Sequence, residues 1–356
     1  MATICGSFAR AKNAFTLKSG RCVTVLIDQN NVLKQANRHN TNTSHQYALR
    51  YTNSRRKVAY MQELYHRRLE VGPEKERHPS VYGCWSHDSE IYAFSQRLGE
   101  KFDEKLLKQA FVQSSYVEQE IEKQKDLGLD VEVDIEDNFE LAQKGQLLAS
   151  RFIKAYLRYS FPQLFEEGIC AIHDYLMSDE TLLHVGSNLG LRELMQTAEY
   201  PPEDHNYITT LLAVIGALLE SQGEHAAEMF VLDFIVPQLV GRDINELWNL
   251  NNPMGLLAAM LKEAGRGEPE PRLLWSACRN TLMPLHHVGI YSDKKLIGKS
   301  PGETMVIAEE LAAREALKSL MKTEDSRAPL VFGDKARNLK LDYNTKNRSV
   351  SEFVGS

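Results

Sequence analysis

The sequence has few cysteines and no long apolar run. Its five cysteines are odd in number and widely separated, and no two form a C-x-x-C pair, which argues for a reducing compartment and against a zinc site. No apolar stretch is long enough to cross a bilayer, so no membrane span is expected. With 43% hydrophobic and 25% charged residues, the 356-residue chain has the composition of a soluble protein with two domains.

Acidic residues are scarce at the amino-terminal end. Residues 1–68 hold 12 Lys and Arg against 2 Asp and Glu, a charge of +10, whereas the rest holds 30 against 46, a charge of −16. The first acid is Asp28, and residues 1–27 have the basic, hydroxyl-rich composition of a mitochondrial transit peptide. A disordered basic tail would have the same composition and is the alternative.

Residues 28–85 form a polar, basic arm, and cations and tyrosines are interleaved over residues 51–68. This interleaving suits RNA, because cations meet phosphates while tyrosines stack on bases. The predicted RNA-binding residues of the arm are Arg55, Arg56, Lys57, Arg67 and Arg68. An exposed helix with a solvated charged face is the alternative.

Two helical stretches are the most informative part of the chain. Residues 138–149 read N-F-E-L-A-Q-K-G-Q-L-L-A, and residues 207–219 read Y-I-T-T-L-L-A-V-I-G-A-L-L. They resemble the two helices of ribonuclease III enzymes that bring four carboxylates around Mg²⁺, through N-E-R-L-E-F-L-G-D and A-D-x-x-E-A-L-I-G. Aligning Gly145 and Gly216 with the glycines of these motifs puts neutral residues at all four carboxylate positions, namely Ala142, Gln146, Thr209 and Leu212.

The loss of these carboxylates predicts the loss of catalysis. Mg²⁺ prefers octahedral oxygen coordination by carboxylates and substrate phosphates, and alanine and leucine offer it no ligand. A shift of register does not restore the site: Glu136 and Glu140 are four residues apart, but the second helix has no acid between His205 and Leu219. We therefore predict no catalytic residue, no bound metal and no cofactor.

The hydrophobic frame of a ribonuclease III domain is nevertheless present over residues 86–245. The string L-L-K-Q-A-F-V-Q-S-S-Y at residues 106–116 resembles the family segment L-L-x-A-L-T-H-x-S-Y. Apolar residues near a 3.6-residue spacing predict the buried face of the helix that begins near residue 138. That face is expected to comprise Leu141, Leu148, Phe152, Ala155 and Tyr159.

Residues 250–322 change in character and resemble a double-stranded RNA-binding domain. A helix opened by Pro253 is followed by three short strand candidates, at residues 272–278, 285–291 and 295–299. A last helix over residues 302–321 is expected to bury Ala308, Leu311, Ala312, Ala316, Leu317 and Leu320. The predicted fold class is therefore α+β, with an all-helical ribonuclease III-like domain followed by an α-β-β-β-α domain.

The RNA-binding chemistry of this second domain is also altered. Such domains usually present a K-K pair at the start of the last helix, where lysines and the helix dipole meet phosphates. Met305 and Val306 stand at that pair with acids nearby, so we predict that they contact a protein instead. Three lysines near the last hairpin are the predicted RNA contacts of this domain, namely Lys294, Lys295 and Lys299. An ordinary solvated hairpin is the alternative.

The carboxyl-terminal extension, residues 323–356, is polar. From Glu324 it holds 6 Lys and Arg and 5 Asp and Glu, with few apolar residues. We expect it to become ordered only on a partner.

Taken together, the arm and the two altered domains are similar to a family of proteins of the large subunit of the mitochondrial ribosome. The strings N-P-M-G-L-L at residues 252–257 and P-G-E-T at residues 301–304 carry this resemblance most specifically. It implies a structural constituent in the mitochondrial matrix that binds ribosomal RNA and other mitochondrial ribosomal proteins and supports mitochondrial translation. The alternatives are a working endonuclease for double-stranded RNA, and an RNA-binding adaptor or inactive partner of a nuclease.

Overall fold

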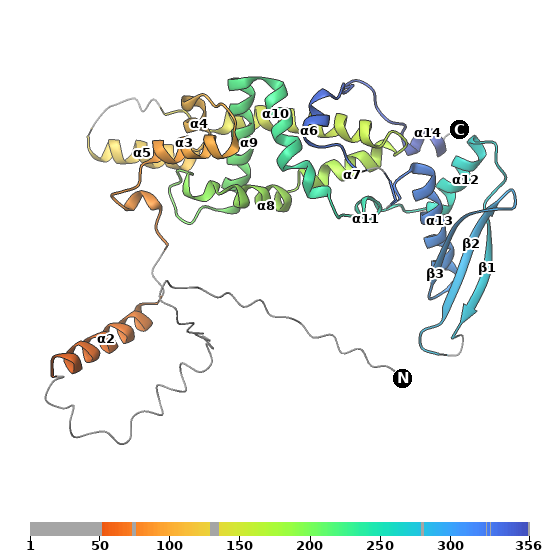
Figure 1. Ribbon diagram of the computed structural model, residues 1–356, viewed down its shortest axis with the longest axis horizontal. Coiled ribbons are helices and arrows are strands. Elements are labelled where there is room, and N and C mark those ends of the chain that lie inside the picture. Colours follow the sequence, from red (N-terminus) through yellow and green to blue (C-terminus); the bar gives the residue numbers. More distant parts are fainter. Residues whose placement is uncertain are drawn as a thin grey trace, which may run out of the picture. The chain divides into compact units, whose positions relative to one another are not determined.

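The computed structural model describes residues 52–72, 76–128, 135–278, 281–324, 326–327 and 329–354. The chain divides into two units, Met1–Lys75 and Glu76–Ser356. The first unit contains helix α2 (Thr52–Val71) (Figure 1). Every side chain of α2 from Ala59 to its end is exposed. The predicted transit peptide and the first part of the basic arm lie outside the described residues.

The second unit begins with a helical domain. Its helices are α3 (His87–Leu98), α4 (Glu104–Ala110), α5 (Ser114–Asp126), α6 (Phe139–Ser160), α7 (Glu166–Leu176), α8 (Asp179–Leu189), α9 (Asp204–Gln222), α10 (Glu224–Phe234) and α11 (Ile244–Leu247). Short 3-10 turns occur at Pro79–Val81, Leu191–Glu193 and Val236–Leu239. The all-helical prediction for this domain is confirmed. Within the described part of the chain, no helix has both the length and the apolar character needed to cross a membrane.

Helices α6 and α9 pack against each other at the centre of this domain (Figure 1). All residues of α9 from Thr210 to Leu218 are buried, and α6 buries most of the predicted face. Tyr159 is an exception, because its side chain is 50% exposed in the last turn of α6. The buried ring is Tyr156, whose hydroxyl donates to the Val331 carbonyl oxygen at 2.8 Å.

The second domain of this unit consists of two helices and a sheet, as predicted. Helix α12 (Pro253–Glu263) is followed by an antiparallel sheet in the order β1-β2-β3 and by α13 (Met305–Met321), which packs on β2 and β3 (Figure 1). The strands are β1 (Glu270–Ala277), β2 (Leu285–Ser292) and β3 (Lys295–Gly302). The Asn252 side chain caps α12 by accepting from the Gly255 N–H at 2.9 Å, with Pro253 in the first turn.

Helix α13 differs from the prediction in its start and in one buried residue. It begins at Met305 because β3 continues to Gly302 and Thr304 Oγ1 accepts from the Ile307 N–H at 3.3 Å. The sheet-facing row is made of small residues, among them Ala308, Ala312, Ala313 and Ala316. Leu311 was expected in that row but is 39% exposed. The alanines occupy the face of α13 that packs on the sheet, and Leu311 lies beside that face.

The carboxyl-terminal tail is packed on its own chain, so the expectation that it needs a partner to become ordered is wrong. It contains a 3-10 turn (Gly333–Asn338) and helix α14 (Val350–Val354), which contacts α12. The Tyr343 hydroxyl donates to Glu228 of α10, and the Arg327 guanidinium lies 4.6 Å from the centre of the Phe161 ring. The polar residues of the tail have partner groups on the helical domain, which the composition of the tail alone could not show.

Candidate functional site

The helix pair α6 and α9 meets at two glycines. A Cβ atom added to Gly145 would lie 2.0 Å from the Leu212 carbonyl oxygen, and one added to Gly216 would lie 2.0 Å from the Leu141 carbonyl oxygen. Real side chains do not tolerate such a contact, so only glycine allows the two backbones to approach this closely. The two sequence motifs that resemble the ribonuclease III signature therefore lie against each other.

The four residues aligned with carboxylates surround this crossing. Ala142 and Leu212 are 7% and 6% exposed and belong to the hydrophobic core. Gln146 lies exposed one turn after Ala142, and the Thr209 hydroxyl donates to the His205 carbonyl oxygen at 3.0 Å within α9. Two of the four positions thus contribute apolar packing, and the other two carry neutral polar groups.

An ion pair joins the two helices. Lys144 Nζ of α6 lies 2.5 Å from Glu220 Oε1 of α9, and the hydrogen bond from Lys144 to Glu220 raises the pKa of the lysine. Among the described residues, no three His, Cys, Asp or Glu side chains are grouped so that they could hold a metal ion. The acids considered for a shifted register, Glu136 and Glu140, are both exposed.

A serine, a histidine and an aspartate form a chain of contacts between α6 and α7. Ser150 Oγ is 2.9 Å from His173 Nε2, and His173 Nδ1 is 2.9 Å from Asp174 Oδ1. A hydrolase also needs donors for an oxyanion, but Ser150 lies inside α6, where backbone N–H groups are used by the helix. Burial lowers the pKa of His173, which favours a neutral ring that links the two helices.

The predicted RNA-binding residues of the arm lie on helix α2. Arg55, Arg56 and Lys57 belong to its amino-terminal half. Arg67 and Arg68 are exposed near its end, and the Arg67 guanidinium donates to Glu63 Oε1 at 2.6 Å. The helix therefore presents cations to solvent along at least its last turns. An exposed ion pair such as Arg67 with Glu63 is weak.

The three predicted lysines of the second domain are brought together by one hairpin. Lys294 lies in the turn between β2 and β3 with a φ of 65°, and Lys295 and Lys299 lie on β3. All three are exposed. The hairpin is thus a small basic surface on a unit whose sequence is acidic overall.

The first turn of α13 exposes apolar residues, as the altered K-K pair suggested. Met305 is 36% exposed and Val306 is 72% exposed. Ile307 and Leu311 are 44% and 39% exposed, although neither was predicted to be exposed. Exposed apolar residues that lie side by side are more informative than scattered ones, because a folded chain usually covers them.

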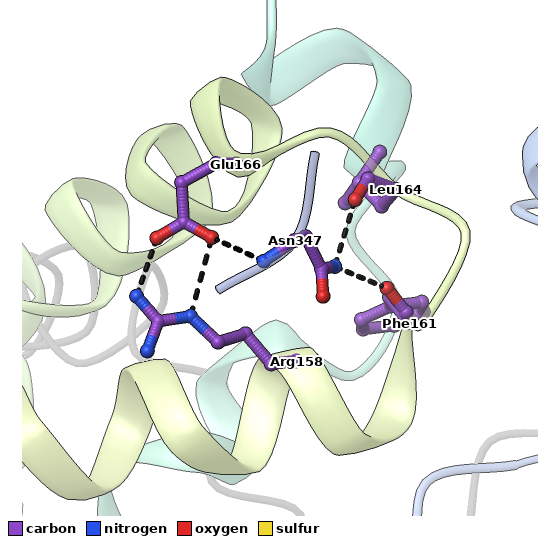
Figure 2. Close-up of polar contacts among 5 residues, drawn as sticks. All are labelled: Arg158, Phe161, Leu164, Glu166 and Asn347. Carbon is purple, nitrogen blue, oxygen red and sulfur yellow. Dashed lines mark hydrogen bonds and ion pairs between the residues drawn. The ribbon is translucent and has the colours of Figure 1, made fainter. Parts of the chain in front are cut away.

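The tail holds the helical domain through a cluster of polar contacts that the sequence did not reveal. Asn347 Nδ2 donates to the carbonyl oxygens of Phe161 at 2.9 Å and Leu164 at 2.8 Å, and the Asn347 N–H donates to Glu166 Oε2 at 3.1 Å (Figure 2). Glu166 also accepts from Arg158, and the side chains of this pair are only 12% and 18% exposed for Arg158 and Glu166. We call residues 343–350 the strap.

The strap is also tied to the next residue of α7 and to the second domain. The Val350 N–H donates to both carboxylate oxygens of Glu167, at 3.1 and 3.0 Å, and the Ser349 hydroxyl donates to the same carboxylate at 2.5 Å. Arg348 pairs with Glu263 of α12 at 2.6 Å. The strap therefore connects α7 of the helical domain with α12 of the second domain.

Both domains match families of known proteins. Residues 86–218 match the family described as large ribosomal subunit protein mL44, endonuclease domain, and residues 248–354 match the MRPL44 dsRNA-binding domain. The second match includes the strap. Large ribosomal subunit protein mL44 of Caenorhabditis elegans is 36% identical over 319 residues, which are 87% of this chain and 79% of that protein.

Bacterial ribonucleases are similar over a smaller part of the chain. Ribonuclease 3 of Bacillus licheniformis is 24% identical over 240 residues, which are 64% of this chain and 89% of that enzyme. The solved nuclease domain of ribonuclease III from Campylobacter jejuni is 18% identical and covers 41% of this chain and 95% of that chain. Its TM-score of 0.35 is too low to support a further argument.

Proposed function

The chain belongs to the family of large ribosomal subunit protein mL44, and from this premise we propose that it is a non-catalytic constituent of the mitochondrial large ribosomal subunit. The observation that carries the proposal is the 36% identity to the nematode protein over 87% of the chain. The ribosome of the mitochondrial matrix is the proposed location, and support of mitochondrial translation is the proposed role.

The absence of catalysis is supported by the α6 and α9 pair. Ala142 and Leu212 fill core space at 7% and 6% exposure, and neither side chain can hold Mg²⁺. Cleavage of a phosphodiester by two metal ions needs anionic oxygens at such positions, so the helix pair keeps the packing of the fold without its ligands.

The proposed contacts divide between two kinds of partner. Arg55, Arg56, Lys57, Arg67 and Arg68 of α2, and Lys294, Lys295 and Lys299 of the hairpin, are proposed to contact ribosomal RNA through phosphates. Met305 and Val306 are proposed to contact a neighbouring ribosomal protein, because they are exposed and apolar.

The proposed division of the chain follows the same roles. Residues 1–27 are proposed to direct the chain to the mitochondrion and residues 28–85 to bind RNA. The ribonuclease III-like domain is proposed to span residues 86–245, the RNA-binding-like domain residues 250–322, and the extension residues 323–356.

Sedimentation tests the proposal. A tagged full-length chain is expected in the large-subunit fraction of a mitochondrial gradient after a high-salt wash, at about one copy per particle by mass spectrometry. Recovery only in light fractions would contradict it and favour a free adaptor.

A cleavage assay separates the enzyme alternative. Purified chain incubated with double-stranded RNA and Mg²⁺ is expected to leave the substrate intact, with a bacterial ribonuclease III as positive control. Cleavage products that disappear on chelation of the metal would favour the endonuclease.

A further inference from the structure

Helix α13 carries an apolar stripe that continues beyond its first turn. Val306 and Ile307 are 72% and 44% exposed, and Leu311, one turn after Ile307, is 39% exposed. Residues four apart lie on one face of a helix, so Ile307 and Leu311 form a single row. The row lies opposite the alanines that pack on the sheet.

The row leads into a groove between the two domains. The groove has a volume of about 480 Å³, and its lining includes Leu311, Ser300, Trp248, Leu250, Asn245 and Glu315. Trp248 and Leu250 are half-buried at its wall. An apolar row that ends in a partly apolar groove offers a path for an extended segment of another molecule.

Acids outnumber cations at this groove. Two cations, Arg314 and Lys318, also line the groove. Arg314 is held by Glu310 at 2.9 Å and Lys318 by Asp243 at 3.0 Å, so both already have an acidic partner. Within the described residues, no ion pair engages the other two acids that line the groove, Glu246 and Glu315. The apolar row therefore has a rim of net negative charge.

We propose that this row and groove dock a lysine- and arginine-rich segment of a neighbouring ribosomal protein, with apolar side chains of that segment placed on Ile307 and Leu311. The inference rests on the proposed function, since it names the kind of protein that α13 meets in the ribosome. Charge complementarity selects the partner, because the rim attracts cations and repels the phosphates of RNA.

Crosslinking inside the particle tests the partner. A photoreactive residue at Val306 (Val306→benzoylphenylalanine) in salt-washed large subunits is expected to give an adduct that a protease removes and a ribonuclease does not. The crosslinked peptide is expected to carry several lysines or arginines beside the attachment point. The matched control is the same photoreactive residue at Val240, which is 65% exposed outside α13, and it should give a different adduct or none.

A ribonuclease-sensitive adduct at position 306, an acidic peptide or the absence of an adduct would overturn the inference. If the chain stays on the particle in these cases, the proposed function stands and only the docking surface is wrong. If the chain leaves the particle, the proposed function itself fails.

A binding measurement with purified full-length chain gives an independent test. A short labelled peptide of lysine and leucine is expected to bind, and its affinity should fall at least about tenfold in Leu311→Lys but not in Leu147→Lys, a substitution at a 73% exposed leucine of α6. A twin peptide with glutamate for lysine should not bind, and a twin with serine for leucine should bind more weakly. Equal binding by the glutamate twin, or equal loss in both variants, would refute the docking surface.

Discussion

The substitution Asn347→Ala tests whether the strap is held by the contacts in Figure 2. It removes two hydrogen bonds from Asn347 Nδ2, to the Phe161 carbonyl oxygen at 2.9 Å and to the Leu164 carbonyl oxygen at 2.8 Å. The bond from the Asn347 N–H to Glu166 remains, because it uses the backbone. The change therefore isolates the side-chain contribution.

The magnitude follows from these two bonds. Each contributes about 1 kcal/mol net, so the strap should lose about 2 kcal/mol against its open form. This free energy corresponds to a factor of about thirty in the equilibrium between closed and open strap. Since part of a structure can open without global unfolding, the effect should be concentrated at the strap and the start of α7.

Native-state hydrogen exchange measures this opening. The amides of Asn347 and Val350, which donate to Glu166 and Glu167, should exchange about thirty times faster in Asn347→Ala. The matched control is Asn344→Ala in the same segment. The Asn344 side chain is exposed, and the bond from Asn344 to Asp342 at 3.0 Å uses the backbone N–H, which the substitution leaves in place. If both variants exchange at the wild-type rate, the strap is not held by Asn347 and the reasoning is refuted.

Three further predictions concern the helix pair, the pH and the metal. Gly145→Ala should lower the free energy of unfolding by at least about 3 kcal/mol in urea melts, because its Cβ would lie 2.0 Å from the Leu212 carbonyl oxygen. The control Gly186→Ala, whose Cβ would make ordinary contacts of 3.4 to 3.5 Å, should be neutral or slightly stabilising. Burial would raise the pKa of Glu167, but bonds from Ser349 and Val350 lower it overall. Its contribution to stability should therefore be full above its usual pKa of 4.5 and be lost as the pH falls through the lower folded value, and Glu167→Gln should lack this dependence in melts at successive pH values. Millimolar Mg²⁺ should leave the melting temperature unchanged within the effect of ionic strength, and a specific rise would contradict the proposed absence of a metal site.

Local sequence patterns predicted the elements of this chain better than the contacts between distant segments. The string N-P-M-G contains the cap and the first turn of α12, so its start at Pro253 could be read directly. The motif glycines Gly145 and Gly216 could be aligned, and they lie at the crossing of α6 and α9. Periodicity placed Tyr159 and Leu311 in the core incorrectly, because it gives a face of a helix but does not show where the packing neighbours end.

The strap could not be predicted for a different reason. Asn347 and Glu166 are 181 residues apart, and their contact depends on the fold of both domains. A polar tail has the composition of a disordered segment. Only the fold shows that the carboxylates of α7 and the carbonyl groups of the turn before α7 are placed to bind it. The residues Glu166 and Glu167, two adjacent acids in the first turn of α7, are the weak signal that was present.

The strap and the α6–α9 helix pair support the same proposed role. In a nuclease, carboxylates at the crossing of α6 and α9 would repel one another until a metal ion bound, and this repulsion would oppose the close approach of the two backbones. Ala142 and Leu212 carry no charge and place buried apolar surface at the crossing. The strap then contacts α7 through Glu167 and α12 through the ion pair of Arg348 with Glu263. Both features favour one fixed shape, which suits the structural role that we propose for this chain.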